Sequence, residues 1–118
     1  KHCWVAGFSF GAWIGMQLLM RRPEITGFIS VSPPANMYDF SFLAPCPSSG
    51  LVINGSNDRV APPQDTVTLV NKLHEQKGIT VTHDEMEGAG HFFEDPYMDP
   101  MIDTVRTYVR RRLTENTR

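Results

Sequence analysis

The sequence has few of the features that mark several large classes of protein. Its two cysteines are too few for a disulfide scaffold. It has no run of about 18 apolar residues, which a helix needs in order to span a bilayer. Eleven Lys and Arg against thirteen Asp and Glu give a net charge of −2, whereas nucleic-acid binders usually carry a basic stripe. The densest basic run, Arg110-Arg111-Arg112, falls at the end of an expected helix. We expect no membrane span and no nucleic-acid partner.

Motifs for cofactors are also missing. The sequence contains no G-x-G-x-x-G segment and no P-loop, and no group of Cys and His has the spacing of a metal site. We therefore expect neither a metal nor any other cofactor. Cys3 is expected to pack in a sheet, and Cys46 lies in a Pro-rich loop. Both are interpreted as free thiols, which favours a reducing, cytoplasmic location.

Strand and helix signals alternate along the chain. Apolar segments predict strands at residues 3–6, 26–32 and 50–54, and loose alternation of apolar and polar residues predicts a fourth strand at residues 79–86. Residues that favour helix, apolar positions at helical spacing and prolines at the ends predict helices at residues 11–22, 62–76 and 97–113. Residues 33–49 hold four prolines and are expected to form a loop with one short turn of helix. This order predicts an α/β fold with a mostly parallel sheet, right-handed crossovers and flanking helices.

The apolar pattern also predicts which faces are buried. The first strand is expected to be buried on both faces, and helix 11–22, which has almost no polar face, on most sides. The apolar stripe of helix 62–76 is Val67, Val70 and Leu73. The stripe of the last helix is expected at Met98, Met101, Ile102, Val105, Tyr108 and Val109.

The segment Gly7–Gly11 (GFSFG) matches the pattern G-x-S-x-G between an expected strand and an expected helix. A serine hydroxyl is a good nucleophile only when it is exposed, aligned and paired with a base. A tight strand-to-helix turn provides exposure and alignment, and it leaves no room for side chains at Gly7 and Gly11. The alternative is a simple Gly-rich turn. The strand before and the helix after favour a nucleophile at Ser9.

Serine chemistry of this type needs a histidine base and an acid. Of the four histidines, only His91 lies on a loop after a strand, and the alternative for it is an ordinary surface histidine. Asp58 follows the third strand, where open parallel sheets collect their functional groups. The alternative for Asp58 is a turn aspartate that caps its own loop. Asp84 and Asp39 are the fallback acids.

With Ser9, Asp58 and His91 in this order, the chain resembles the carboxyl-terminal half of an α/β-hydrolase. The resemblance runs from the strand before Ser9 to the final helix, and so covers essentially all of residues 1–118. Within this superfamily the chain is most similar to the small esterase-like and dienelactone-hydrolase-like members. Dienelactone hydrolase itself uses a cysteine nucleophile, so the serine at this position favours esterase chemistry.

The resemblance implies a serine hydrolase that cleaves small carboxylic esters or thioesters through an acyl-enzyme intermediate. Ser9 would attack the carbonyl, His91 would transfer the proton, and Asp58 would hold the imidazole. The backbone N–H of Phe10 would be one oxyanion donor. In this fold the second donor comes from a loop after an early strand, and this sequence does not contain that strand.

Aromatic and apolar residues near these positions would line the substrate pocket. Phe8, Met37 and Phe92 are the candidates, although they could equally pack in the core or against loops. Phe92 and Phe93 are expected to pack beneath His91. Residues 33–49 are too few for a large helical lid, so we expect an open pocket.

We expect residues 1–118 to form an incomplete α/β-hydrolase domain that lacks the amino-terminal strands and the oxyanion loop. The chain begins at Lys1 with no signal-peptide pattern, and Cys3–Ala6 would be an exposed apolar edge. This edge would pair with the missing amino-terminal half or within a homo-oligomer. Two other functions stay open: a non-catalytic binding module of this fold, and a peptidase or acyltransferase on the same scaffold.

Overall fold

A computed structural model describes residues 3–116 of the chain. Within that range, strands and helices alternate as the sequence predicts, and their ends differ from the expected ones by three residues at most. The elements are β1 (Trp4–Phe8), α1 (Phe10–Arg21), β2 (Gly27–Val31), the 3-10 turn η1 (Ser41–Leu43), β3 (Gly50–Gly55), α2 (Pro63–His74), β4 (Val81–Met86) and α3 (Met98–Asn116).

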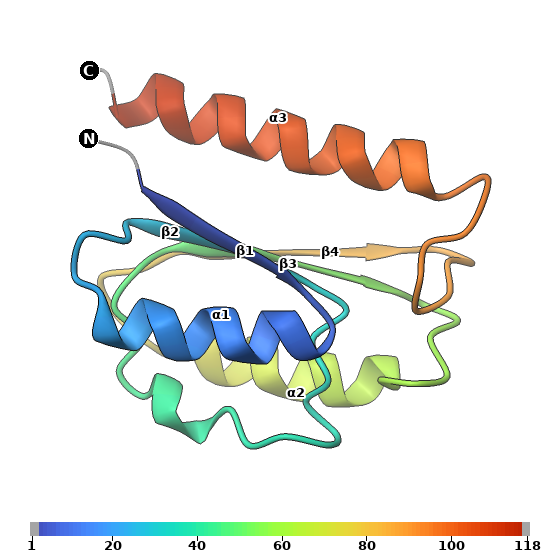
Figure 1. Ribbon diagram of the computed structural model, residues 1–118, viewed down its shortest axis with the longest axis horizontal. Helices are drawn as coiled ribbons and strands as arrows, with labels where there is room; N and C mark the ends of the chain where they lie inside the picture. The colour runs from blue at the N-terminus through green and yellow to red at the C-terminus, as the bar shows by residue number, and fades with distance from the viewer. Residues whose placement is uncertain (1–2, 117–118) are drawn as a thin grey trace.

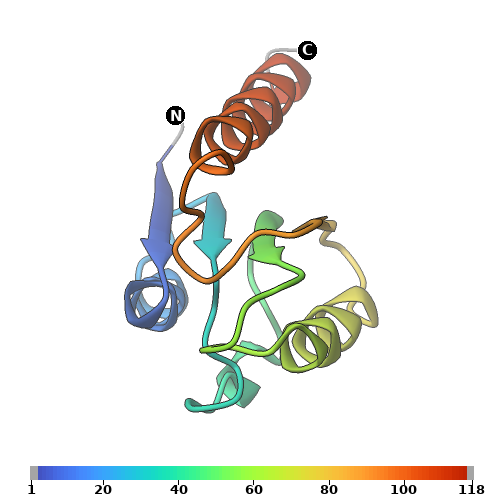
Figure 2. The same ribbon diagram turned by 90° about the vertical axis from the view of Figure 1, so that its right-hand side faces the viewer.

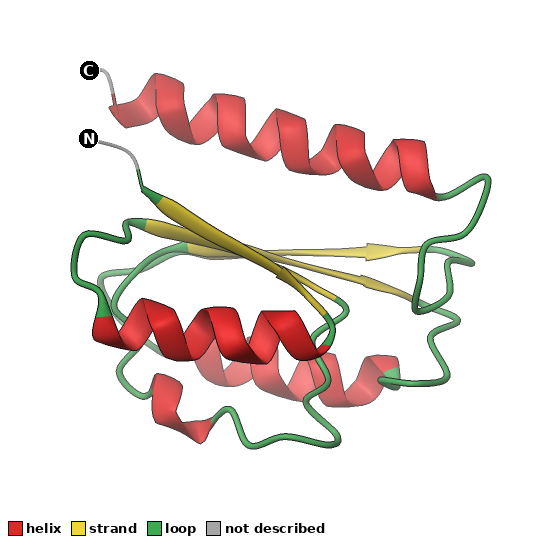
Figure 3. Cartoon of the chain, in the orientation of Figure 1, coloured by secondary structure: helices red, strands yellow, loops and turns green. Residues whose placement is uncertain are grey.

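The four strands form one parallel sheet in the order β1-β2-β3-β4, so each strand pairs with its neighbour in the sequence. Helices α1 and α2 cover one face of this sheet, and α3 covers the other (Figures 1 and 3). Figure 2, turned by 90°, shows the same layers with α3 alone on its side. The predicted α/β fold is therefore confirmed.

Alternation along the strands divides the core into two layers. Neighbouring side chains of a strand point to opposite faces of a sheet, and Phe28 and Val52 accordingly pack with α1 and α2. Ile29, Leu51 and Ile53 pack against α3 instead. Since β3 lies between two strands and two helix layers, all six of its residues are buried. Each large apolar side chain buried in this way stabilises the fold by about 1.5–3 kcal/mol.

The burial expected for β1 and α1 is wrong. In β1, Ala6 and Phe8 are exposed and the other residues are half-buried, because β1 is an edge strand that pairs only with β2 in the described chain. In α1, the side chains at Phe10, Ile14 and Leu18 are 43–50% exposed. These three residues are spaced by four and form an apolar row, here called the α1 stripe, which is left half exposed within residues 3–116.

Other side chains also differ from the expected pattern. Cys3 is exposed and does not pack in the sheet, because it lies just before the edge strand β1. Val67 is 38% exposed and Thr66 is buried in its place, because the buried face of α2 begins one residue earlier. Met98 and Ile102 are 38% and 41% exposed, beside the row of α3 that packs on the sheet. No helix within residues 3–116 has the length and apolar character needed to cross a membrane.

Candidate active site

Ser9 lies at a sharp turn between β1 and α1. Its backbone has φ 56° and ψ −121°, a region that costs a residue with a side chain about 1–3 kcal/mol. Two backbone hydrogen bonds hold the turn: the N–H of Ser9 donates to the carbonyl of Val31 (2.8 Å), and the N–H of Ala12 donates to the carbonyl of Ser9 (2.9 Å). The tight turn expected from the G-x-S-x-G pattern is present, and its backbone is strained at Ser9.

The two glycines of this turn differ in the space around them. A Cβ at Gly7 would lie 2.2 Å from the carbonyl oxygen of Gly11 and 2.7 Å from the Cα of Ala12. Only glycine allows the strand and the helix to approach so closely. A Cβ at Gly11 would meet nothing within 4 Å. The expectation that both positions lack room for a side chain is therefore wrong at Gly11.

Two hydrogen bonds join Ser9, His91 and Asp58 in a row. The Oγ of Ser9 is 2.8 Å from the Nε2 of His91, and the Nδ1 of His91 is 2.8 Å from the Oδ2 of Asp58. Since a carboxylate only accepts, the Nδ1 of His91 carries the proton, and in the neutral ring its Nε2 accepts the proton of the Ser9 hydroxyl. The arrangement can remove a proton from Ser9 and stabilise the imidazolium that results.

Asp58 is fixed by its own loop as well as by the histidine. The residue is 3% exposed, and its second oxygen, Oδ1, accepts the backbone N–H groups of Val60 (2.9 Å) and Ala61 (2.8 Å). The aspartate thus caps its loop and orients His91 at the same time. The fallback acids lie elsewhere: Asp84 lines a small cavity beside α3, and Asp39 accepts the N–H of Ser41.

The acid loop after β3 and the histidine loop after β4 are joined directly. A Cβ at Gly55 would lie 2.1 Å from the carbonyl oxygen of Ala89, so glycine is required there for the loops to touch. The N–H of Asn57 donates to the same carbonyl (2.9 Å), and the N–H of Gly88 donates to the Oγ of Ser56 (2.7 Å). These contacts set the position of Asp58 relative to His91.

Aromatic rings surround the candidate base. The centroids of Phe8 and Phe92 lie 5.4 Å and 5.0 Å from that of His91, and the two phenyl rings are 5.7 Å apart. Phe8 and Phe92 are 42% and 58% exposed, so they border the site on its open side. Phe93 is fully buried with φ 51° and packs in the core near α3. Met37, the third pocket candidate, is 54% exposed on the loop after β2, outside this aromatic group.

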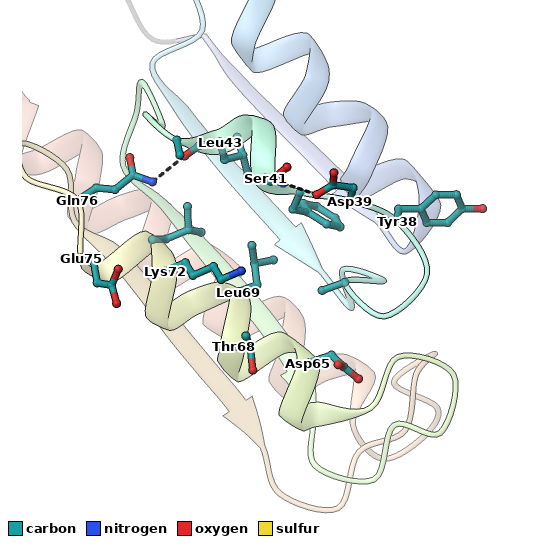
Figure 4. A pocket seen from close by; sticks show the side chains of 14 residues that line it. Tyr38, Asp39, Ser41, Leu43, Asp65, Thr68, Leu69, Lys72, Glu75 and Gln76 are labelled. Carbon is teal, nitrogen blue, oxygen red and sulfur yellow. Dashed lines mark hydrogen bonds between the residues drawn. The ribbon is translucent and has the colours of Figure 1, made fainter.

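A separate cavity of about 600 Å³ lies between the loop after β2 and helix α2 (Figure 4). Its apolar lining includes Leu43 and Leu69, and charged groups such as Asp39 and Lys72 border it. The N–H of Ser41 holds the pKa of Asp39 below its ordinary value. None of Ser9, Asp58 and His91 lines this cavity. The row of three residues lies instead at the carboxyl ends of the strands.

No cluster of three or more metal-ligating side chains occurs within residues 3–116. One polar residue near the site was missed by the sequence analysis: Ser32, which follows β2, is fully buried and hydrogen-bonds the backbone of His91. Its signal in the sequence is a serine at the carboxyl end of an apolar strand, directly before two prolines.

Comparison with known proteins places this fold among the α/β hydrolases. A protein of unknown function from Agrobacterium tumefaciens, named as a candidate alpha/beta hydrolase, is 61% identical, with a TM-score of 0.94 over 98% of this chain and 52% of that one. A Xanthomonas campestris protein described as an α/β serine hydrolase without a lid is 32% identical, with a TM-score of 0.79 over 94% of this chain and 48% of that one.

A curated relative, an uncharacterized protein of Rickettsia prowazekii (strain Madrid E), is 52% identical over 93 residues, which are 75% of this chain and 39% of that protein. No protein-family model matches the chain. The chain belongs to the α/β-hydrolase superfamily. It spans about half the length of the two solved structures, and less than half of the curated relative.

Proposed function

We propose that the full-length protein containing this chain is a serine hydrolase of small carboxylic esters or thioesters, similar to the small esterase-like members of the superfamily. The observation that carries the proposal is the unbroken row of hydrogen bonds from Ser9 through His91 to Asp58, each 2.8 Å long. An ordinary Gly-rich turn would not require a buried histidine and carboxylate aligned behind its serine. The strained backbone at Ser9 supports the same conclusion.

The reaction proceeds in two halves. The Oγ of Ser9 attacks the acyl carbonyl carbon while its proton passes to the Nε2 of His91. The tetrahedral intermediate then collapses, and the leaving alcohol or thiol takes that proton. The acyl group remains esterified to Ser9. Water attacks this ester with His91 as its base, and the acid is released. Asp58 stays ionised throughout and stabilises the imidazolium through the Nδ1 hydrogen bond.

The oxyanion is stabilised at the start of α1. Phe10 is the first residue of this helix, so its backbone N–H has no partner within the helix and is free to bind an oxygen. The partial positive charge at the helix N-terminus adds to the effect. We assign the Phe10 N–H as one oxyanion donor, and a second donor is supplied by the part of the protein outside this chain.

The surroundings of the site favour small substrates. Phe8 and Phe92, which lie beside His91, would contact the acyl or alcohol group. The loop after β2 contains only the short turn η1 (Ser41–Leu43), which is too small to form a helical lid. The Xanthomonas campestris protein is likewise described as lacking a lid. An open site of this kind suits short-chain esters.

We also propose that the α1 stripe and the free edge of β1 are covered in the full-length protein by the remaining part of the α/β-hydrolase domain. Exposed apolar rows beside an unpaired strand edge promote aggregation when nothing covers them.

A reducing, cytoplasmic location is also part of the proposal. The two cysteines, the exposed Cys3 and the buried Cys46, are both free, which supports such a location.

Labelling and turnover of the full-length protein test the proposed function. A fluorophosphonate, which reacts with activated serines, is expected to label Ser9, and a short-chain nitrophenyl ester is expected to be hydrolysed. Ser9→Ala should abolish labelling and lower turnover by about 10⁴-fold or more, whereas Ser41→Ala, at an exposed serine outside the site, should change neither.

The same assays separate the rival functions. A non-catalytic binding module would leave Ser9 unlabelled and show no turnover. A peptidase would cleave a matched amide at a readily measured rate, which an esterase would not, and an acyltransferase would transfer the acyl group to an added alcohol faster than to water. A Ser9→Ala protein that keeps more than about a tenth of the parent activity would contradict the mechanism.

A further inference from the structure

Ser32 holds an unusual position directly after β2. It is fully buried, and its backbone has φ 52°, a left-handed conformation that residues with a side chain rarely adopt. Glycine would adopt this conformation at lower cost. A serine in such a place is therefore explained by what its side chain does. Its hydroxyl donates a hydrogen bond of 2.8 Å to the backbone carbonyl of His91, 59 residues away.

The peptide group between Val31 and Ser32 makes hydrogen bonds to two other parts of the site. Its carbonyl, that of Val31, accepts the N–H of Ser9 at 2.8 Å. Its N–H, that of Ser32, donates to the carbonyl of Ile53 in β3 at 2.7 Å. This strand leads into the loop that carries Asp58. This peptide group and the Ser32 hydroxyl thus bond the backbone of Ser9, the backbone of His91 and the strand that precedes Asp58.

We infer that Ser32 is a positioning residue for His91, an inference that rests on the proposed hydrolase function. Its hydroxyl fixes the carbonyl of His91, and hence the direction in which the imidazole leaves the backbone. The Nε2 of His91 must meet the Oγ of Ser9 while the Nδ1 meets Asp58, and these two contacts lie at opposite ends of one rigid ring. A small rotation of the His91 backbone would lengthen at least one of them.

The physical reason for this role is that side-chain contacts alone do not define where the ring sits. The Asp58 carboxylate holds the Nδ1 but leaves the ring free to tilt about that contact. The Ser32 hydroxyl adds a second fixed point on the same residue, at the main chain. A displacement of about 1 Å in a catalytic group can reduce the rate by about 100-fold, so this second point matters for turnover more than for folding.

Three variants of the full-length protein test the inference. Ser32→Ala removes the hydroxyl and keeps the strained backbone. Ser32→Gly removes the same hydroxyl but relieves the strain, so it remains informative if the alanine variant folds poorly. Ser30→Ala is the matched control, because Ser30 lies two residues earlier in the chain and is 3% exposed. The measurements are kcat and KM on a nitrophenyl ester, melting temperature, and the number of serines labelled when fluorophosphonate labelling is complete.

Both Ser32 variants are expected to lower kcat by about 10- to 100-fold, with KM within about twofold of the parent and an unchanged number of labelled serines. Ser30→Ala should stay within about threefold of the parent. A purely structural role would instead lower the fraction of protein molecules labelled at Ser9, while kcat per labelled molecule stayed normal. That result would overturn the inference. So would normal kcat in Ser32→Gly, because strain and not the hydroxyl would then explain any loss in Ser32→Ala. Loss of activity in Ser9→Ala with normal turnover in both Ser32 variants would leave the hydrolase function standing and reject only the role of Ser32.

Discussion

Replacing Gly7 by alanine should damage both the stability and the activity of the full-length protein. The new Cβ would lie 2.2 Å from the carbonyl oxygen of Gly11, whereas ordinary contact begins at 3.4 Å, so strand and helix would have to separate by about 1.2 Å. Overpacking of this kind typically costs about 1–3 kcal/mol, and here both partners are backbone. We expect a loss at or above the upper end of that range.

The effect of Gly7→Ala on turnover should exceed its effect on folding. Ser9 is two residues away on the same turn, and its N–H is held by the carbonyl of Val31. A shift of about 1 Å at this turn moves the Oγ of Ser9 relative to the Nε2 of His91, which should lower kcat by about 100-fold or more. The measurements are urea unfolding followed by circular dichroism, and ester hydrolysis well below the unfolding midpoint.

Gly11→Ala is the matched control for this prediction. It makes the same chemical change at the other glycine of the turn, where a Cβ meets nothing within 4 Å. Since Gly11 lies in α1, alanine should be neutral or stabilise by up to about 1 kcal/mol. Equal damage from the two substitutions, or a Gly7→Ala protein with normal stability and turnover, would refute the reasoning from close approach.

Other predictions follow from Asp58, Cys46 and His83. Asp58→Asn should lower kcat by about 10⁴-fold because it removes the carboxylate that orients the base, while Asp84→Asn should leave kcat within twofold; equal losses would contradict the assignment of the acid. Burial raises the pKa of the Cys46 thiol, so iodoacetamide at pH 8 should modify Cys46 at least tenfold more slowly in the folded protein than in urea; equal rates by mass spectrometry would be the contrary result. Burial lowers the pKa of His83 below its ordinary 6.5. Below about pH 6.5 the unfolded chain therefore binds more protons at this residue than the folded chain does, and the free energy of unfolding decreases as the pH is lowered. His83→Gln should weaken that dependence in urea unfolding, and an unchanged slope would count against it.

The residues of the hydrogen-bonded row could be predicted from the sequence because each carries a local signal. Ser9 is flanked by glycines between a strand and a helix, and both Asp58 and His91 follow predicted strands. In a parallel sheet the ends of such strands meet at one edge. The order of the elements was therefore enough to bring together three residues spread over 82 positions.

The sequence could not show which neighbour fills which space. Phe92 and Phe93 are chemically identical, and the positive φ at Phe93 is part of the local geometry that turns one ring into the core and leaves the other beside His91. The apolar composition of α1 predicts burial, but it does not say which part of a protein provides the covering surface. The role inferred for Ser32 depends on a carbonyl 59 residues away, and such a contact leaves no periodic trace.

The order of the strands has a consequence for when the hydrogen-bonded row of Ser9, His91 and Asp58 can form during synthesis. The sheet is arranged in chain order, so β1, β2 and β3 can pair while the remainder is still being translated. His91 is translated after all four strands, because it follows β4 and lies 82 positions after Ser9 in the chain. Closing a loop of that length is entropically costly until intervening strands have paired. In a refolding experiment, reactivity with fluorophosphonate should therefore appear after the helical circular-dichroism signal, and it would report completion of the crossover that leads into β4.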